Sequence, residues 1–461
     1  MCSCRQEIPL SYHEPTRGIR ATALIVELLL LSLPMLSQDN GTSNSTPLPV
    51  TVFGGGDRPR MSYAGDQNPR NMLLVTTGYE ATYDDNPAGQ NSSGQADEEQ
   101  GLSNQVVVVH QSPRTNANLN YQSSLEYFHH YSQFNRFNQT LTADEQLTLS
   151  SHISVRLRDD LVATKGLYAP SGGDAVTSGI GSPTDLNSTI YTPLNNVRAN
   201  TARADLMTQL SSLGSLDVFG AYATRTFSQD ASSSYGTVTQ NAGAEYVWRV
   251  NEHGSVGLLG VYQRIDLNGS LLQGSASRLQ SGATLPAIAW KLRPTFEISL
   301  FAGPQFIRQV EADGVGSGVG SLPVQMKWAG GAGLVREGRW MSAMLSAEHA
   351  VTDGGGLLSF VSNSSVSGGV RKRVYHAWDL TIDYGYARNQ WISSGASSAL
   401  LTEQSGRATI TRPLGRKIVL EVEYDFMEQM TNGNLSIGSA FHRNRVGSSL
   451  AWNWGAIRMG R

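Results

Sequence analysis

The segment NANLNYQSSLEY, residues 116–127, alternates polar and apolar side chains with a period of two. One face carries Ala117, Leu119, Tyr121, Ser123, Leu125 and Tyr127, and the other carries Asn116, Asn118, Asn120, Gln122, Ser124 and Glu126. A helix would repeat its apolar positions about every 3.6 residues, so the period of two predicts a β-strand. One face of this strand would contact an apolar environment and the other would contact water. The same alternation begins at Asn71 and returns clearly at residues 238–249 and 418–426.

Polar turns divide the chain after Asn71 into extended segments. Short turns alternate with longer connections rich in Gly, Ser and Asn, and eight short turns flanked by strands predict about 18 strands. The short turns are expected at Ser112–Arg114, Ser150–His152, Ser211–Gly214, Asn251–Gly254, Leu292–Pro294, Glu337–Arg339, Arg373–His376 and Pro413–Arg416. Sixteen strands would remain if the first pair, Asn71–Tyr83 and Asn104–Gln111, lay outside the wall.

The length of these segments favours a membrane barrel over a sandwich. A strand of about 13 residues tilted by about 40° rises roughly 33 Å, which exceeds the apolar band of about 25 Å on a membrane barrel. Closure leaves no unpaired strand edge in lipid. We therefore predict an all-β fold at residues 71–454, a closed antiparallel transmembrane up-and-down β-barrel. Trp248, Trp290, Trp340 and Trp378 lie close to short turns, as residues of an interfacial aromatic girdle do.

Composition sets limits on the partners. The 461 residues carry a net charge of −3, from 35 Lys and Arg against 38 Asp and Glu, so no nucleic-acid partner is expected. Only 16% of the residues are charged, below the roughly 25% of soluble domains. A soluble secreted all-β protein is the alternative to the membrane barrel.

The N-terminal region resembles an export signal. The apolar run Ala21–Leu36 follows Arg17 and Arg20 and is shorter than the roughly 20 residues of a spanning helix. We expect a signal peptide region at residues 1–37 and a flexible periplasmic lead-in at residues 38–70. The two Cys residues of the chain, Cys2 and Cys4, precede the expected cleavage, so no thiol is expected in the mature protein.

The segment Arg445–Trp452, RVGSSLAW, resembles the C-terminal assembly signal of bacterial outer-membrane β-barrels. In that pattern Arg445 is the polar position, Gly447 the glycine, and Leu450 and Trp452 the two hydrophobic positions. The resemblance implies a porin-like barrel in the outer membrane of a Gram-negative-type bacterium, in contact with outer-membrane lipid and the barrel assembly machinery. The chain departs from the pattern because it continues as a tail, residues 455–461.

Charged residues are expected to line the lumen. Phase assignment places on the inner face of the last four strands a charge ladder of Asp379, Asp383, Arg407, Glu421, Glu423, Asp425, Arg443 and Arg445. A turn at Pro413–Arg416 would bring Arg407 opposite about residue 422, near Glu421 and Glu423. A similar estimate across the turn at Arg373–His376 places Asp383 beside Arg407. A second inner cluster comprises Arg156, Arg158, Asp160, Arg203 and Asp205. Such charges either tune ion selectivity or simply pair across strands.

The longest connection, Lys165–Asn196, is the third long one. By resemblance to porins it would fold inward and narrow the pore, and surface display is the alternative.

No catalytic, metal-binding or cofactor-binding constellation stands out in the sequence, so an enzyme is not expected. Asp84 and Asp85 begin the first long connection and are interpreted as solvated carboxylates. We expect a passive channel for small hydrophilic solutes. The alternatives are an exporter barrel that guides a polysaccharide, and an adhesin or scaffold barrel with a plugged lumen.

Overall fold

The computed structural model describes residues 71–87, 96–165, 196–227, 236–268, 277–311, 323–355, 358–375, 378–392, 400–415, 417–432 and 440–458. The chain divides into two units, Met1–Val50 and Thr51–Arg461, and all described residues belong to the second. The expected signal peptide region and lead-in, and the connection at 166–195, lie outside the described residues.

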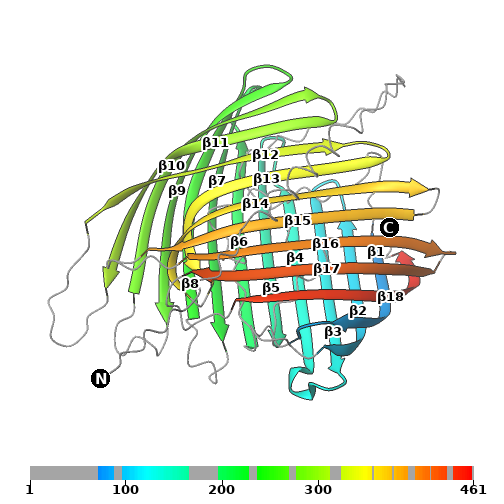
Figure 1. Ribbon diagram of the computed structural model, residues 1–461. Helices are drawn as coiled ribbons and strands as arrows, with labels where there is room; N and C mark the ends of the chain where they lie inside the picture. Colours follow the sequence, from blue (N-terminus) through cyan, green and yellow to red (C-terminus); the bar gives the residue numbers. More distant parts are fainter. Residues whose placement is uncertain are drawn as a thin grey trace, which may run out of the picture. The chain divides into compact units, whose positions relative to one another are not determined.

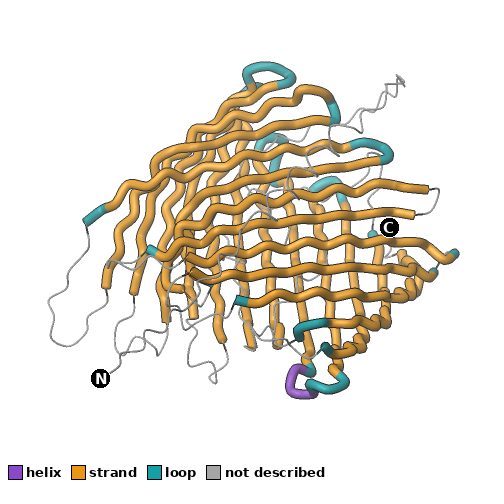
Figure 2. Tube along the Cα trace, viewed as in Figure 1, coloured by secondary structure: helices purple, strands orange, loops and turns teal. Residues whose placement is uncertain are grey.

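The described residues are built almost entirely of strands (Figures 1 and 2). They are β1 (Met72–Asp84), β2 (Asp97–Gln111), β3 (Thr115–Phe128), β4 (Arg136–Thr148), β5 (Ile153–Lys165), β6 (Asn196–Gln209), β7 (Gly214–Phe227), β8 (Gly236–Arg249), β9 (Gly254–Asn268), β10 (Ser277–Arg293), β11 (Phe296–Glu311), β12 (Gln325–Glu337), β13 (Met341–Gly354), β14 (Leu358–Tyr375), β15 (Trp378–Trp391), β16 (Leu400–Leu414), β17 (Ile418–Asn432) and β18 (Phe441–Arg458). A single 3₁₀ turn, Ser132–Phe134, joins β3 to β4.

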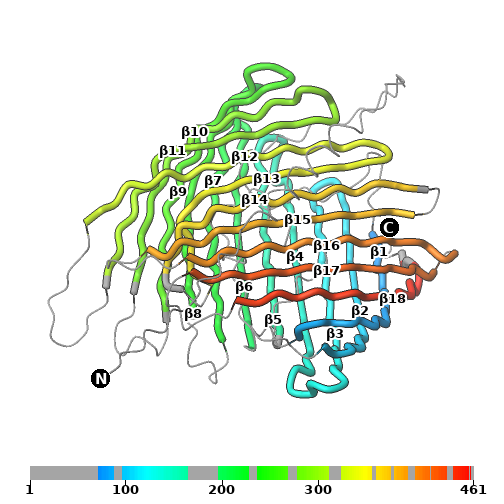
Figure 3. Tube along the Cα trace, in the orientation of Figure 1, coloured from blue at the N-terminus to red at the C-terminus, as the bar shows by residue number. Residues whose placement is uncertain are grey.

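The 18 strands form one antiparallel sheet that closes on itself. Each strand pairs with its neighbours in sequence, and β1 also pairs with β18, from Met72 opposite Arg458 to Asp84 opposite Arg445. Figure 3 shows the first strands, in blue, beside the last strand, in red, at this seam. The predicted closed barrel is confirmed. The 16-strand alternative is wrong, because β1 and β2 are both part of the wall.

The short turns fall at or within about three residues of the predicted polar clusters, because β10, β14 and β16 each continue into the range expected as a turn. Four of the turns share one pattern of hydrogen bonds. Ser112, Ser150, Ser211 and Asn251 each accept hydrogen bonds on the side-chain oxygen from backbone N–H groups two and three residues later. These short polar side chains therefore satisfy the turn backbone that the strand ladder leaves unpaired. β18 runs to Arg458, past the expected end of the barrel at residue 454.

The outer face carries an apolar band. Across β8 to β11, outward residues change from Trp248 and Trp290 near the short turns to Tyr262 and Phe306 near the long connections, and all four side chains are exposed. The eight residue steps from Trp290 to Gly282, which pairs with Tyr262, rise roughly 20 Å at a tilt of about 40°. The next outward row is polar, with Arg264, Gln280 and Arg308 in register. This height approaches the apolar band of about 25 Å on membrane barrels, and the band is bounded by aromatic and then polar residues.

The wall separates between β12 and β13 toward the long connections. Their pairing begins at Glu337 opposite Ser342 and stops at Gly330 opposite His349. β12 continues beside β11 to Gln325, whereas β13 continues beside β14 to Gly354. Figure 1 shows β12 running straight on at the left while β13 and β14 turn downward. The sheet remains closed through the paired half of the two strands.

Leu258 lies in the middle of the band, and half of its surface, 50%, is exposed. A Leu258→Arg substitution places a charge at hydrocarbon depth, so we expect the free energy of unfolding to fall by about 2 to 4 kcal/mol. Urea unfolding in lipid vesicles, followed by tryptophan fluorescence, measures the change. The matched control Gln280→Arg adds the same charge in the polar row and should cost less than about 1 kcal/mol. Equal losses for both variants would contradict the assigned band.

Candidate functional site

The inner face of the barrel divides into a charged part and an apolar part. Charged side chains point inward from β15 to β18 and, across the seam, from β1 to β7. The apolar part is a buried cluster of side chains from β7 and β9 to β12: Phe219, Leu259, Val261, Leu285, Ala287, Ala289, Phe301 and Ala329. Its two Phe rings rest over glycines, since a Cβ at Gly243 or Gly331 would lie within 2.6 Å of ring carbons of Phe219 or Phe301.

Arg407 sits at the centre of the predicted charge ladder. It is opposite Asp383 on β15, as expected, and opposite Asp425 on β17. Its Nε donates to Asp425 Oδ1 at 2.5 Å. The register estimate near residue 422 is wrong by three residues, because β16 continues through Pro413 to Leu414 and the turn comes later.

Glu421 and Asp379 lie nearer the short turns. Glu421 accepts a hydrogen bond from Thr411 Oγ1 at 3.4 Å, and Asp379 binds both Arg371 and Arg373 at 3.3 Å. Glu423 faces Gly447 of β18 in register. The ladder therefore begins at the short-turn end of the wall.

Arg445 carries the ladder across the seam. Its Nη2 lies 3.2 Å from Glu99 Oε2 on β2, and its guanidinium lies within 4.0 Å of Glu80, Asp84 and Asp425. Arg443 donates from Nε to Asp84 Oδ2 at 2.8 Å. The first and last strands are therefore joined by ion pairs as well as by the backbone ladder.

The same chain of charges continues from β2 to β4. Arg136 is buried and binds Glu126 and, at 3.5 Å, Glu99. We call Asp84, Glu99, Glu126, Arg136, Asp425, Arg443 and Arg445 the seam network. Sequence reasoning missed its members on β1, β2, β3 and β4. The signal was present for Glu126, which lies on the polar face of the segment at 116–127.

The expectation that Asp84 and Asp85 are solvated loop carboxylates is wrong. Asp84 ends β1, has 0% exposure and accepts a hydrogen bond from Asn86 N at 3.0 Å in addition to the Arg443 pair. Asp85 accepts hydrogen bonds from Asn444 N at 2.7 Å and Asn444 Nδ2 at 2.6 Å. Both carboxylates therefore fasten the end of β1 to β18.

The second predicted cluster also lies on the inner face. Arg156 pairs across strands with Asp144 on β4 at 3.0 Å. Arg158 and Arg203 each bind the aspartate two residues further along their own strand, Asp160 at 2.6 Å and Asp205 at 2.8 Å. Register places Arg156 opposite Asp205 and Arg158 opposite Arg203, so β5 and β6 bring the cluster together. The Arg203 guanidinium also stacks over the Phe219 ring at 4.4 Å, where the charged part meets the apolar part.

The residues of the expected assembly signal lie on the closing strand. Leu450 and Trp452 face outward and are exposed, whereas Arg445 faces inward. Gly447 gives room at the seam, because a Cβ there would lie 2.9 Å from Thr82 Oγ1 on β1. Recognition by the assembly machinery stays a prediction.

The lumen is bridged near the long connections by the wall itself. Asp353 of β13 binds Arg225 of β7 at 3.0 Å, and both side chains are buried. Val351 N, also on β13, donates to Gln305 Oε1 of β11 at 3.2 Å. The expected constriction by the connection at 165–196 falls outside the described residues apart from its ends. The observed bridge comes from strands instead.

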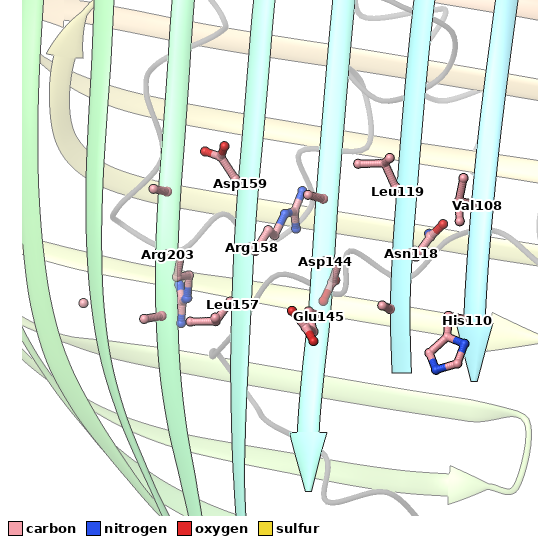
Figure 4. Close-up of a pocket in the computed structure, with 15 residues that line it drawn as sticks. Val108, His110, Asn118, Leu119, Asp144, Glu145, Leu157, Arg158, Asp159 and Arg203 are labelled. Atoms are coloured by element: carbon pink, nitrogen blue, oxygen red, sulfur yellow. The ribbon is translucent and has the colours of Figure 1, made fainter. Parts of the chain in front are cut away.

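A shallow hollow of about 520 Å³ lies along β2 to β7 (Figure 4). Ala117, Glu145, Leu157, Ala204 and Gly220 form one row across it in register. This row shares the outward phase of the exposed Leu157, so the hollow is a feature of the outer face more than of the lumen.

Among the described residues, no three His, Cys, Asp or Glu side chains are grouped so that they could hold a metal ion. In the same part of the chain, no helix is long and apolar enough to cross a membrane.

Comparison with known proteins adds distant structural similarities. No protein-family model matches the chain, and no curated protein matches it. Crystal structures that resemble it include Pseudomonas aeruginosa OccK3 (OpdO), with 13% identity over 83% of this chain and 96% of that chain and a TM-score of 0.40. The siderophore receptor PiuA from Acinetobacter baumannii has 8% identity over 83% and 82% of the two chains, with a TM-score of 0.43. Similarities this distant carry no argument about function.

The class of the protein follows from its own surfaces. A closed antiparallel sheet, an apolar band bounded by aromatic residues and a charged inner face define a porin-like outer-membrane β-barrel. The closed 18-strand barrel fits the predicted location in an outer membrane.

The seam network predicts a stability effect. Arg443→Gln removes the closer of the two cations from the buried Asp84 carboxylate and leaves only Arg445, whose Nε lies 3.9 Å away. We therefore expect the free energy of unfolding to fall by about 3 kcal/mol. Chemical unfolding in detergent or lipid measures it. The control Arg373→Gln removes a partly exposed pair with Asp379 and should cost no more than about 1 kcal/mol. Recovery in Arg443→Gln/Asp84→Asn is expected, and its absence would argue against the stated cause.

Proposed function

We propose that this protein is an outer-membrane channel for the passive passage of small hydrophilic solutes. The supporting observation is the extent of the charge ladder along the inner face. It runs from Asp379 near the short turns, through Arg407 and Arg445, to Asp84 where β1 reaches the first long connection. Polar groups therefore follow one side of the lumen from end to end, which is what a hydrated path across a bilayer requires.

The pairing of the charges indicates how such a path would select solutes. Each Arg of the ladder faces at least one carboxylate, so the wall offers both donors and acceptors to a passing solute. Opposite charges at close range produce a local field across the path rather than a strong barrier to one sign of ion. We therefore expect weak ion selectivity and a preference for polar, neutral or zwitterionic solutes.

A non-transporting scaffold is the second candidate, because the Arg225–Asp353 bridge and the strand ends around it occupy one end of the lumen. No feature of the described residues points to a polysaccharide in particular. Catalysis forms no part of the proposal.

Planar bilayer recordings test the channel. We expect stepwise conductance from the purified wild-type protein, and silence under all conditions would favour the scaffold. Arg407→Gln removes a positive charge from the lumen, so the cation-to-anion permeability ratio should rise by about twofold, measured as the reversal potential in a salt gradient. Arg308→Gln removes the same charge from the outer face and serves as the control. An identical reversal potential in all three proteins would remove the ladder from the selectivity argument.

A further inference from the structure

The ends of β13 and β14 near the long connections have their outer face turned into the lumen. Leu345 and Val366 are exposed on the outer face of these strands, and Val351 and Phe360, each six residues away, share that face by the period of two. Yet Val351 is 1% exposed and Phe360 is 0% exposed.

The residues that bury them belong to the inner face of other strands. Val351 and Phe360 pack in one cluster with Ile265 of β9, Leu279 of β10 and Ile307 of β11. These three alternate with the outward-facing Tyr262 and Phe306 of the same wall, so they point inward. Residues 350–354 and 360–363, which we call the infolded segment, therefore lie inside the barrel against the inner face of β9 to β11, and not beside β12, the neighbour of β13 in the wall.

The edge that the infolded segment leaves behind is complementary to it. Residues 325–329 of β12 have no partner on β13 among the register pairs. Continuing the register from Gly330 opposite His349 would bring Trp328 opposite Val351 and Met326 opposite Asp353. Trp328 and Met326 are exposed, so Val351 would then join the outer apolar surface. The alternation of β13 thus suits the wall as well as the infolded position.

A small set of polar contacts holds the infolded position. Asp353 Oδ2 accepts from Arg225 Nη1 at 3.0 Å and from Gly355 N at 3.2 Å. Val351 N donates to Gln305 Oε1, and Gln305 Nε2 donates to Ser281 Oγ at 3.4 Å. Re-pairing with β12 would give Val351 N a strand partner but would separate the Arg225–Asp353 pair. The two arrangements exchange one set of hydrogen bonds for another, as the states of a switch do.

We propose that the infolded segment is the gate of this channel. In the closed state it bridges the lumen through Arg225 and Asp353, and in the open state residues 350–354 pair with residues 325–329 and rejoin the wall. That these two states control passage through the lumen rests on the proposed channel function, whereas the re-pairing of β13 with β12 does not. Any permeant that binds the open lumen better than the closed one would shift the equilibrium toward opening.

Disulfide trapping tests the re-pairing without measuring transport. In a background with Cys2 and Cys4 replaced by Ser, oxidised Trp328→Cys/Val351→Cys should form a disulfide, because opposite residues in a ladder lie close enough to bridge. Leu334→Cys/Leu345→Cys, already opposite each other, is the positive control. Trp328→Cys/Thr352→Cys is the negative control, since Thr352 lies on the other face. A bridge in the positive control but not in Trp328→Cys/Val351→Cys would overturn the gate.

Bilayer recordings test the latch. Asp353→Asn should raise the open-to-closed ratio on the order of tenfold, and the exchange Arg225→Asp/Asp353→Arg should restore the wild-type ratio. Asp266→Asn, which removes a carboxylate paired with Arg264 and Arg278 on the outer face, should leave the ratio unchanged. An unchanged ratio in Asp353→Asn would overturn the latch. If the Trp328→Cys/Val351→Cys disulfide forms but the variant conducts no current in either the oxidised or the reduced state, the proposed channel function is wrong. The re-pairing of β13 with β12 would still be supported.

Discussion

The structure depends on the requirement that every backbone N–H and C=O within a bilayer finds its partner inside the protein. An open sheet would leave two full-length edges in hydrocarbon, and the pairing of β1 with β18 removes both. Residues 325–329 of β12, opposite the infolded segment, are the stretch of the described wall that lacks its β13 partner. Once the sheet is closed, alternate side chains are committed to lipid or to the lumen. The apolar band outside and the charges inside are therefore two results of one closure.

The inner face shows how a barrel accommodates charge that is remote from bulk water. An isolated buried charge would be expensive, so Arg445 is surrounded by carboxylates from three other strands. Where charges are absent, the wall uses aromatic rings set over glycines, as with Phe219 above Gly243. The two parts meet where Arg203 stacks on Phe219, so the change from polar to apolar lining occurs between adjacent strands.

Much of the architecture could be predicted because a single period governs it. The two-residue alternation and the turn clusters predict the number of strands. The order of the strands in the sheet follows as well, because each strand pairs with its neighbours in sequence. Register depends on where each turn begins, and the placement of Pro413 in a turn rather than in β16 displaced the expected partner of Arg407. Asp84 was misjudged because its partner, Arg443, lies at the other end of the chain. The infolded segment could not be predicted, since its alternation equally suits the wall.

The seam joins residues that are synthesised at opposite ends of the chain. Asp84 and Arg443 are 359 positions apart, so their contact carries a very large loop-closure entropy and cannot form until translation is nearly finished. Contacts of such high order form slowly in folding. An unfinished chain therefore retains Asp84 on β1 without the two cations that neutralise it, Arg443 and Arg445, which disfavours premature entry into hydrocarbon. The last strand supplies these cations, so the chain becomes electrostatically suited to insertion into the membrane only once it is complete.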